Sequence, residues 1–167
     1  MQPFHPSLNA IAQMIPFGIG GAVKNGININ LALVHRAFVC VIIEEGAANT
    51  TPTMTLGQST VGAGTNAGTN EKAMTAECRV WYNEACQLNN VLTEGVTTAG
   101  AFTVTGAGQS RTKMYIFEVI PEEHMDIANR FDVLVINTTD PAITAVLGAF
   151  AILEPRYGPL PSVYTDY

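Results

Sequence analysis

The chain has 167 residues, which is long enough for one domain with a substantial buried core. Charged residues make up only 13 % of it, against roughly 25 % in typical soluble proteins, so either its surface is rich in uncharged polar residues or part of it is covered by other protein. The net charge is −6, and no stretch concentrates lysine or arginine, which argues against nucleic acid binding through phosphate neutralisation.

Other sequence signals indicate a chain that folds in a reducing compartment. The longest apolar run, Ala142 to Leu153, is shorter than the ~20 residues that a membrane helix requires, and the N-terminus lacks the pattern of a secretory signal. The three cysteines Cys40, Cys78 and Cys86 cannot all pair with one another. Cys40 and Cys78 lie in apolar or alternating stretches, where a free cysteine behaves as a small hydrophobe. We therefore expect a cytoplasmic folding environment and no membrane partner.

Residues 1–26 differ from the rest of the chain, because they combine prolines and glycines with scattered apolar residues. We expect Ser7 to cap a short helix from Leu8 to Ile15, which Pro16 would end. The segment is typical of an arm that either reaches onto a neighbouring subunit or covers its own core, and the sequence leaves both open. The apolar side chains available for such contacts are Phe4, Leu8, Ile11, Ile15 and Phe17.

From residue 27 onward, apolar residues recur mostly with a period of two, which is typical of half-buried β-strands. The run from Ala37 to Ile43 is continuously apolar and indicates a central strand buried on both faces, with His35 and Arg36 interrupting the chain before it. Residues 60–71 are rich in Gly, Thr and Asn and predict a loop. The expected strands are Ile27–Val34, Ala37–Ile43, Thr53–Thr60, Met74–Tyr82, Phe102–Thr105, Lys113–Ile120, Val133–Ile136 and Ala145–Leu153.

The segment from Phe131 to Tyr157 holds two of these runs, on either side of a turn that contains Pro141. We predict an antiparallel hairpin buried on at least one face, because both runs are short and rich in β-branched residues and proline cannot continue a helix. A helix from Ala142 to Glu154 is the alternative, since alanine and leucine are good helix formers.

Pro121 to Asp126 has the pattern of a helix start, with proline at the first position and acids in the first turn. His124 beside these acids could hold a metal ion, but acids at a helix N-terminus already have a structural role. The sequence contains no Cys-x-x-Cys pair and no paired histidines, so we expect no metal and no cofactor. None of His5, His35 and His124 lies in a nucleophile motif, and we expect no enzymatic activity.

Seven or eight short strands, one helical turn and long loops are the profile of an all-β protein. We expect an antiparallel β-sandwich or jelly roll with extended N- and C-terminal arms. The lack of β-α-β alternation argues against a parallel sheet. The predicted division is an N-terminal arm (residues 1–26), a sandwich domain (27–154) and an extended C-terminal tail (155–167).

Two parts of the chain carry residue types that are enriched at protein interfaces. Arg79 and Trp81 would share one face of their strand, either as a contact surface or as a stacked pair on an ordinary sheet surface. The proline-rich tail should run extended, and it is either an anchor or a disordered terminus. Its candidate interface residues are Pro155, Arg156, Tyr157, Tyr164 and Tyr167.

The segment from Leu147 to Tyr157, LGAFAILEPRY, resembles the end of a family of tailed-bacteriophage virion proteins of about this length, which carry a Leu-Gly…Ile-Leu-x-x-Pro-Arg-Tyr pattern. Upstream, Asp126 to Asp132 is similar to that family's Asp-x-x-Asn-x-Phe-Asp segment, with Arg130 at a position where glycine is expected. The resemblance covers roughly the last forty residues, continues through the middle only as a strand pattern, and does not include residues 1–26.

This resemblance implies a capsid decoration (cement) protein with a jelly-roll fold, bound on a shell of HK97-type major capsid protein and without catalytic residues. Its partners would be that capsid protein and further copies of itself, as a dimer or trimer. It would be located on the virion surface, after folding and assembly in the bacterial cytoplasm. A head–tail connector or tail protein, and a glycan-binding module on the virion surface, are the alternatives.

Overall fold

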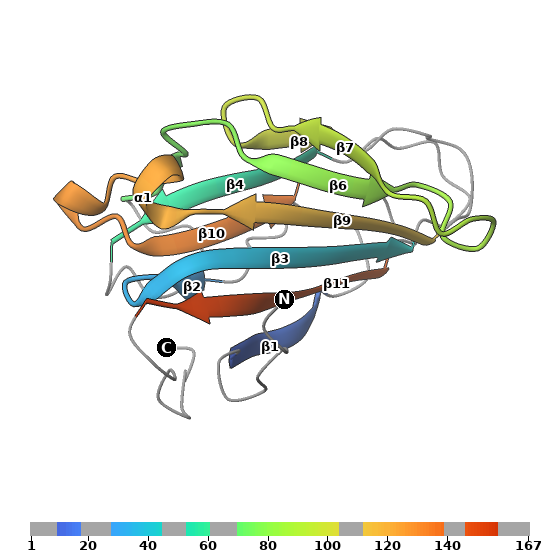
Figure 1. Cartoon of the computed structure of the whole chain (residues 1–167), viewed down its shortest axis with the longest axis horizontal. Coiled ribbons are helices and arrows are strands. Elements are labelled where there is room, and N and C mark those ends of the chain that lie inside the picture. The colour runs from blue at the N-terminus through green and yellow to red at the C-terminus, as the bar shows by residue number, and fades with distance from the viewer. Residues whose placement is uncertain are drawn as a thin grey trace, which may run out of the picture.

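The computed structural model describes residues 10–17, 28–44, 53–60, 70–103, 112–138 and 146–156. These residues form two antiparallel sheets that pack face to face, with one short α-helix at an end of the sandwich (Figure 1). The predicted all-β antiparallel sandwich is confirmed, and its finer assignment to a jelly roll stays a prediction.

The larger sheet, sheet A, has six strands in the order β1-β11-β3-β9-β6-β7. All of its neighbouring strands are antiparallel, and the two central ones, β3 and β9, pair continuously from Ala37–Val119 to Glu44–Thr112. Its strands are β1 (Ala10–Phe17), β11 (Val146–Pro155), β3 (Val34–Glu44), β9 (Thr112–Val119), β6 (Arg79–Asn83) and β7 (Thr93–Val96).

The smaller sheet, sheet B, has five strands, with the order β2-β10-β4-β5 and β8 paired to a different part of β4. Strand β10 lies in its middle and pairs with both β2 and β4. The strands are β2 (Asn28–Asn30), β10 (Val133–Thr138), β4 (Thr53–Ser59), β5 (Lys72–Ala73) and β8 (Ala101–Thr103).

The core lies between the two sheets and uses every second residue of their strands, as the period of two predicts. Sheet A contributes Tyr115 and Phe117 from β9, and sheet B contributes Leu56 and Leu134. All four are completely buried, and each such side chain contributes about 1.5–3 kcal/mol when it leaves water.

Three predicted connections are wrong, and in each of them the chain crosses from one sheet to the other. The predicted hairpin within Phe131–Tyr157 consists of real strands, but β10 belongs to sheet B and β11 to sheet A. Likewise, the strand predicted over Met74–Tyr82 is divided between β5 and β6, with the buried Met74 and Cys78 between them. The strand predicted over Ile27–Val34 breaks at the turn after β2, so that β3 begins at Val34. Two strands bury alternate residues whether they face each other across the core or pair side by side in one sheet. The alternation of apolar residues therefore does not distinguish the two arrangements.

The helix predicted from Leu8 to Ile15 is also wrong, because residues 10–17 form β1 and pair with β11. Pairing along the edge of β11 supplies backbone hydrogen bonds that outweigh local helix propensity. Pro16 is compatible with this position, since β1 is an edge strand among the described strands of sheet A. The remaining residues of the predicted N-terminal arm, and the loop at 61–69, lie outside the described residues.

The predicted helix start at Pro121 is confirmed by α1 (Pro121–His124), which has proline in its first turn together with Glu122 and Glu123. A short 3-10 turn, η2 (Ile127–Asn129), follows and ends at Arg130 in the left-handed conformation. This turn leads the chain from the end of sheet A into β10 of sheet B.

Candidate interaction surfaces

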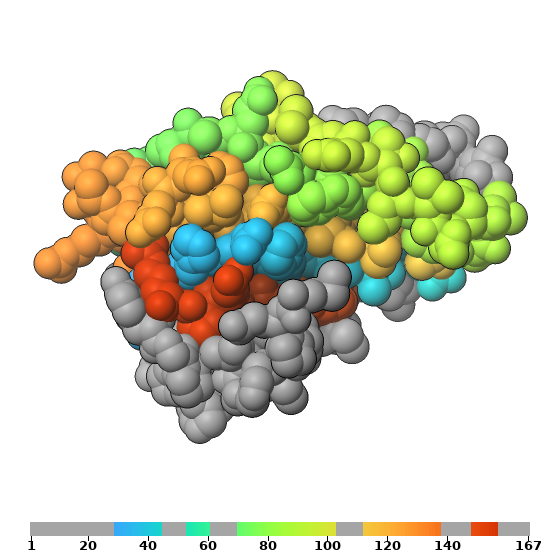
Figure 2. All heavy atoms as spheres, viewed as in Figure 1, coloured from blue at the N-terminus to red at the C-terminus, as the bar shows by residue number. Residues whose placement is uncertain are grey.

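The side of sheet A that faces away from the core carries the most distinctive group of side chains in the described structure. On β3, Val39 and Val41 point into the core, so the residues between them point outward. We call this surface the outer face, and side chains of β3 and β11 are visible on it in the space-filling view (Figure 2). From the strand register, its residues are Arg36, Phe38, Cys40 and Ile42 on β3, Met114, Ile116 and Glu118 on β9, Arg79, Trp81 and Asn83 on β6, Glu94 and Val96 on β7, and Gly148, Phe150, Ile152 and Glu154 on β11.

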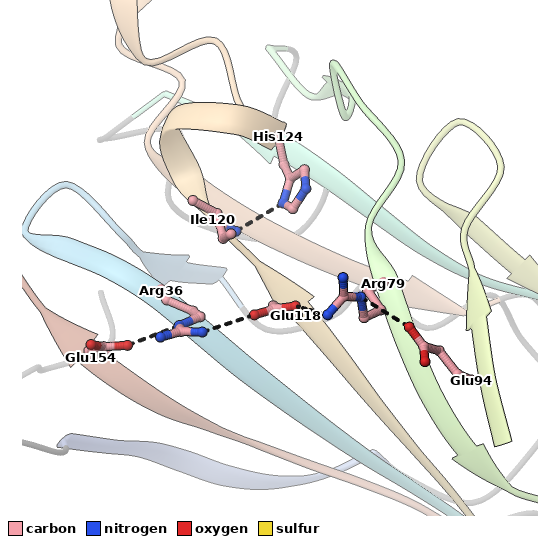
Figure 3. A network of polar contacts seen from close by, with 7 residues as sticks. All are labelled: Arg36, Arg79, Glu94, Glu118, Ile120, His124 and Glu154. Atoms are coloured by element: carbon pink, nitrogen blue, oxygen red, sulfur yellow. Dashed lines mark hydrogen bonds and ion pairs between the residues drawn. The ribbon is translucent and has the colours of Figure 1, made fainter. Parts of the chain in front are cut away.

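A row of alternating charges crosses the outer face diagonally from β11 to β7, and we call it the charge ladder (Figure 3). Arg36 lies 2.9 Å from Glu154 and 3.2 Å from Glu118. Arg79 lies 3.7 Å from Glu118 and 3.2 Å from Glu94. The ladder therefore joins five strands through four ion pairs, each between neighbouring strands.

Burial differs along the charge ladder and determines how much each ion pair contributes. The Glu118 side chain, at the centre, is only 10 % exposed, whereas Arg79 and Glu94 are 55 % and 62 % exposed. Glu154 and then Glu118 raise the pKa of Arg36 above its ordinary value, because both carboxylates accept hydrogen bonds from its guanidinium. Exposed pairs contribute about 0–1 kcal/mol, so the pairs to Glu118 should be the stronger ones.

Two aromatic rings lie beside the charge ladder. The rings of Phe38 and Trp81 are 6.3 Å apart between centroids, with their planes inclined by 41°. Each carries an arginine of the ladder over its face: Arg36 is 5.4 Å from the Phe38 centroid and Arg79 is 5.6 Å from that of Trp81. This arrangement fixes both guanidinium groups between an aromatic face and a carboxylate.

An apolar patch lies on the outer face on one side of the charge ladder, and the exposed Val96 lies on the other side. The strand register places Phe150, Cys40, Ile116 and Trp81 in one row across four strands. In the next row, Ile42 is exposed. A Cβ added at Gly148, which pairs with Ile42, would meet no atom of the described residues within 4 Å, so these residues leave the space above the sheet open there. Ile42 is thus the exposed member of a row of mostly partly buried apolar side chains, and apolar residues gathered on a sheet surface in this way mark a candidate interface.

The structure corrects the prediction that β3 is buried on both faces. Its central position is confirmed, since it lies between β11 and β9. However, Phe38 is only partly buried and Ile42 is 38 % exposed. The continuous apolar run of this strand therefore supplies the core on one side and the apolar patch on the other.

The two ends of the described fold lie at one corner of the sandwich. Ala10, where β1 begins, pairs with Leu153, close to the end of β11 at Pro155. Residues 1–9 and residues 157–167 are therefore attached at adjacent points on the same edge of sheet A.

Arg156 is bound at this corner by contacts within the chain. Its backbone N–H donates to the carbonyl of Leu33, and its Nε donates to the carbonyl of Val34 at 3.0 Å. Its Nη1 lies 2.9 Å from Glu122 of α1. Arg156 thus ties the end of β11 to the β2–β3 turn and to the helix.

His124 also has a structural role at this end of the molecule. Its side chain is buried, and its Nδ1 accepts a hydrogen bond of 2.9 Å from the backbone N–H of Ile120 (Figure 3). Burial lowers the pKa of His124 below its ordinary value, although the nearby Glu123 and Glu118 act in the opposite direction. A neutral imidazole is required, because a protonated Nδ1 cannot accept this bond.

Within the described ranges, no group of three or more His, Cys, Asp or Glu side chains is arranged to hold a metal ion. No helix among those residues is long and apolar enough to cross a membrane. Cys40 and Cys78 are buried free thiols, as predicted for small hydrophobes, and burial raises their pKa values to about 11 and about 12.

The predicted interface residues fall into four groups. Arg79 and Trp81 lie together on the outer face, as predicted. Pro155 ends β11, and Arg156 follows it in the intramolecular contacts just described. Ile11, Ile15 and Phe17 belong to β1, where only the backbone is described. The others, Phe4, Leu8, Tyr157, Tyr164 and Tyr167, lie outside the described residues.

Most of the outer face escaped the sequence-based prediction, including Arg36, Phe38 and Glu118. Their spacing along β3 and β9 contains the signal, because Arg36, Phe38, Cys40 and Ile42 follow one another at every second position. The sequence does not indicate which of the two faces of these strands packs against sheet B.

No protein-family model matches the chain, and no curated protein matches it in sequence. The resemblance to phage virion proteins therefore rests on the residues quoted above and stays a prediction.

Proposed function

We propose that this chain is a capsid decoration (cement) protein of a tailed bacteriophage, which binds HK97-type major capsid protein subunits on the shell and stabilises the capsid without chemistry. The observation that carries this proposal is the common corner at which the described chain begins, at Ala10, and ends, at Arg156. A rigid body with two segments at one point can engage two neighbouring capsid subunits at once. Such bivalent attachment strengthens binding without any new contact in the body itself.

The C-terminal motif supports the proposal through its position in the fold. Leu147 to Pro155 form most of β11, which pairs with both β1 and β3, and Arg156 fixes the strand's exit. A motif with this role would be retained by relatives that share the fold. The spacing departs from the family pattern, since only Glu154 separates Leu153 from Pro155 where the pattern has two residues.

The direct test uses capsids prepared with and without this protein. Capsids that carry it should survive heating and chelation that disrupt capsids without it, because each bound copy adds buried interface between subunits. Equal resistance of the two preparations would overturn the cement role.

A double variant locates the contact. Tyr164→Ala with Tyr167→Ala should weaken capsid binding at least tenfold, since truncation of interface tyrosines commonly costs more than about 1.4 kcal/mol. Leu88→Ala is the matched control, because Leu88 is 69 % exposed on the sandwich itself and should leave binding unchanged.

A glycan-binding function is the second candidate, and the Phe38–Trp81 pair favours it. Aromatic faces beside hydrogen-bonding charged groups, here Glu118 and Arg79, are what a sugar ring requires. A glycan-array screen tests it, followed by titration of Trp81 fluorescence with any sugar that binds. An unchanged emission on addition of that sugar would exclude this face as the site.

A further inference from the structure

The outer face of sheet A combines two features that fit it to one kind of partner. One is the apolar patch, in which Ile42 is exposed and Trp81, Ile116 and Phe150 are partly exposed. The other is the charge ladder, whose signs alternate strictly from Glu154 to Glu94. We propose that the outer face is the contact surface for a second copy of this chain, related to the first by a two-fold axis. This inference goes beyond the proposed function and does not depend on it.

The alternating signs of the charge ladder make it complementary to itself. Consider a two-fold axis that lies between the outer faces of the two copies, parallel to both faces and at right angles to the charge ladder. This axis reverses the order of the charges in the second copy. If the axis passes between Arg36 and Glu118, Arg36 of each copy faces Glu118 of the other, and Glu154 of each faces Arg79 of the other. Opposite charges then meet at all four of these positions, which favours this register over one shifted by a single strand.

The same axis brings the two apolar patches together. The patch lies on one side of the charge ladder, and rotation about an axis perpendicular to the ladder keeps it on that side. Ile42, Ile116 and Phe150 of one copy, which are exposed or partly exposed, are therefore covered by the patch of the other copy. Covering them removes apolar surface from water, which provides the main driving force.

The size of the outer face sets the expected strength of the dimer. Five strands about 4.8 Å apart and four rows about 7 Å apart give a footprint of roughly 20 by 20 Å. This is smaller than the ~800 Å² per partner of a standard interface, so we expect a dissociation constant in the micromolar range. Because each copy uses the same face, the assembly closes at two copies, which favours a dimer over a trimer.

Sedimentation equilibrium of the full chain, from about 1 to 300 µM, tests the stoichiometry. The expected result is a reversible monomer–dimer equilibrium. Trp81 is the only tryptophan of the chain and lies on the outer face, so its fluorescence reports on the location. Acrylamide quenching of Trp81 should weaken at least twofold as the dimer forms.

Two variants on the outer face should abolish the dimer. Ile42→Lys places an uncompensated charge in the apolar patch. Gly148→Arg places a long side chain where the described residues leave open space, so this variant should keep the fold. It therefore tests the proposal even if the Ile42→Lys variant fails to fold. Leu33→Lys is the matched control, because Leu33 is 48 % exposed, compared with 38 % for Ile42, and lies outside the outer face. It should dimerise as the parent chain does.

Three results would overturn the proposal. One is a chain that stays monomeric throughout this concentration range. Another is an oligomer, of any size, that persists in the Gly148→Arg variant. The third is acrylamide quenching of Trp81 that does not change as the oligomer forms, since self-association would then use another surface.

Discussion

Arg130 occupies a backbone conformation that suits glycine better. Its φ of 62° lies in the left-handed region, where a Cβ is strained, at the end of the 3-10 turn that leads into β10. The resemblance to phage virion proteins predicts glycine at this position.

Replacement of Arg130 by glycine should therefore stabilise the protein. We expect Arg130→Gly to raise the free energy of unfolding by about 0.5–1 kcal/mol, the relief of strain minus the extra chain entropy of glycine. Ala128→Gly, in the same turn but at ordinary backbone angles, is the control and should lower it by a similar amount. Urea titration of both variants measures these changes, and a destabilised Arg130→Gly would contradict the prediction.

His124 should make stability depend on pH in the mildly acidic range. Burial lowers its pKa in the folded state below the value of about 6.5 that the unfolded chain has. The unfolded state therefore binds more protons between these two values. The contribution of His124 to the free energy of unfolding is fully present above its pKa in the unfolded state. It decreases as the pH falls toward its pKa in the folded state, by up to about 1.4 kcal/mol per pH unit.

Chemical denaturation at pH 7.0 and 5.5 tests this prediction. His124→Asn keeps an oxygen acceptor near the Nδ1 position but does not titrate, so its stability should change less over this interval. His35→Asn alters an exposed histidine of β3 and should retain the full dependence. If the free energy of unfolding changes with pH by the same amount in the parent chain and in His124→Asn, then groups other than His124 cause the pH dependence.

At the level of the elements, the alternation of apolar residues predicted most strands and the fold class. Strands β4 and β9 agree closely with their predicted ranges, because each is one uninterrupted strand that stays within one sheet. The errors at β10–β11 and β5–β6 have one physical cause. A chain that crosses between two sheets continues to bury alternate residues, so its pattern does not change where the sheet changes.

The candidate surface was predictable only in part for a related reason. Arg79 and Trp81 were recognised by residue type, and they do lie on the outer face. Their neighbours Phe38 and Ile116 come from distant parts of the sequence and are brought beside Trp81 by strand order alone. A long apolar strand predicts burial on both sides, and only the three-dimensional structure shows that one side of β3 is an outer surface.

The charge ladder should stabilise sheet A mainly through its buried centre. We expect a double-mutant cycle of Arg36→Gln and Glu118→Gln to give a coupling energy of about 1 kcal/mol. The matched cycle of Arg79→Gln and Glu94→Gln, between more exposed side chains, should give less than about 0.5 kcal/mol and decrease further in 1 M salt. Both cycles are measured at low protein concentration, so that self-association does not contribute. Equal couplings would mean that burial of Glu118 has no effect on the pair.

At the level of the whole molecule, the two proposals concern two neighbouring parts of the sandwich. The outer face of sheet A would join two copies, and the corner at Ala10 and Arg156 would direct residues 1–9 and 157–167 toward the shell. Glu154, at one end of the charge ladder, lies next to this corner, so the two proposed contacts adjoin each other. Bivalent attachment of a dimer would also compensate for a weak contact in each copy.

A cryo-EM reconstruction of the virion that carries this chain tests the account most directly. We expect the sandwich to recur over the outside of the shell, with the corner at Arg156 toward the capsid subunits and the outer faces of sheet A joined in pairs. Copies confined to the portal vertex or the tail would contradict the decoration function and indicate a connector or tail protein. If no virion contains this chain, the account as a whole is contradicted.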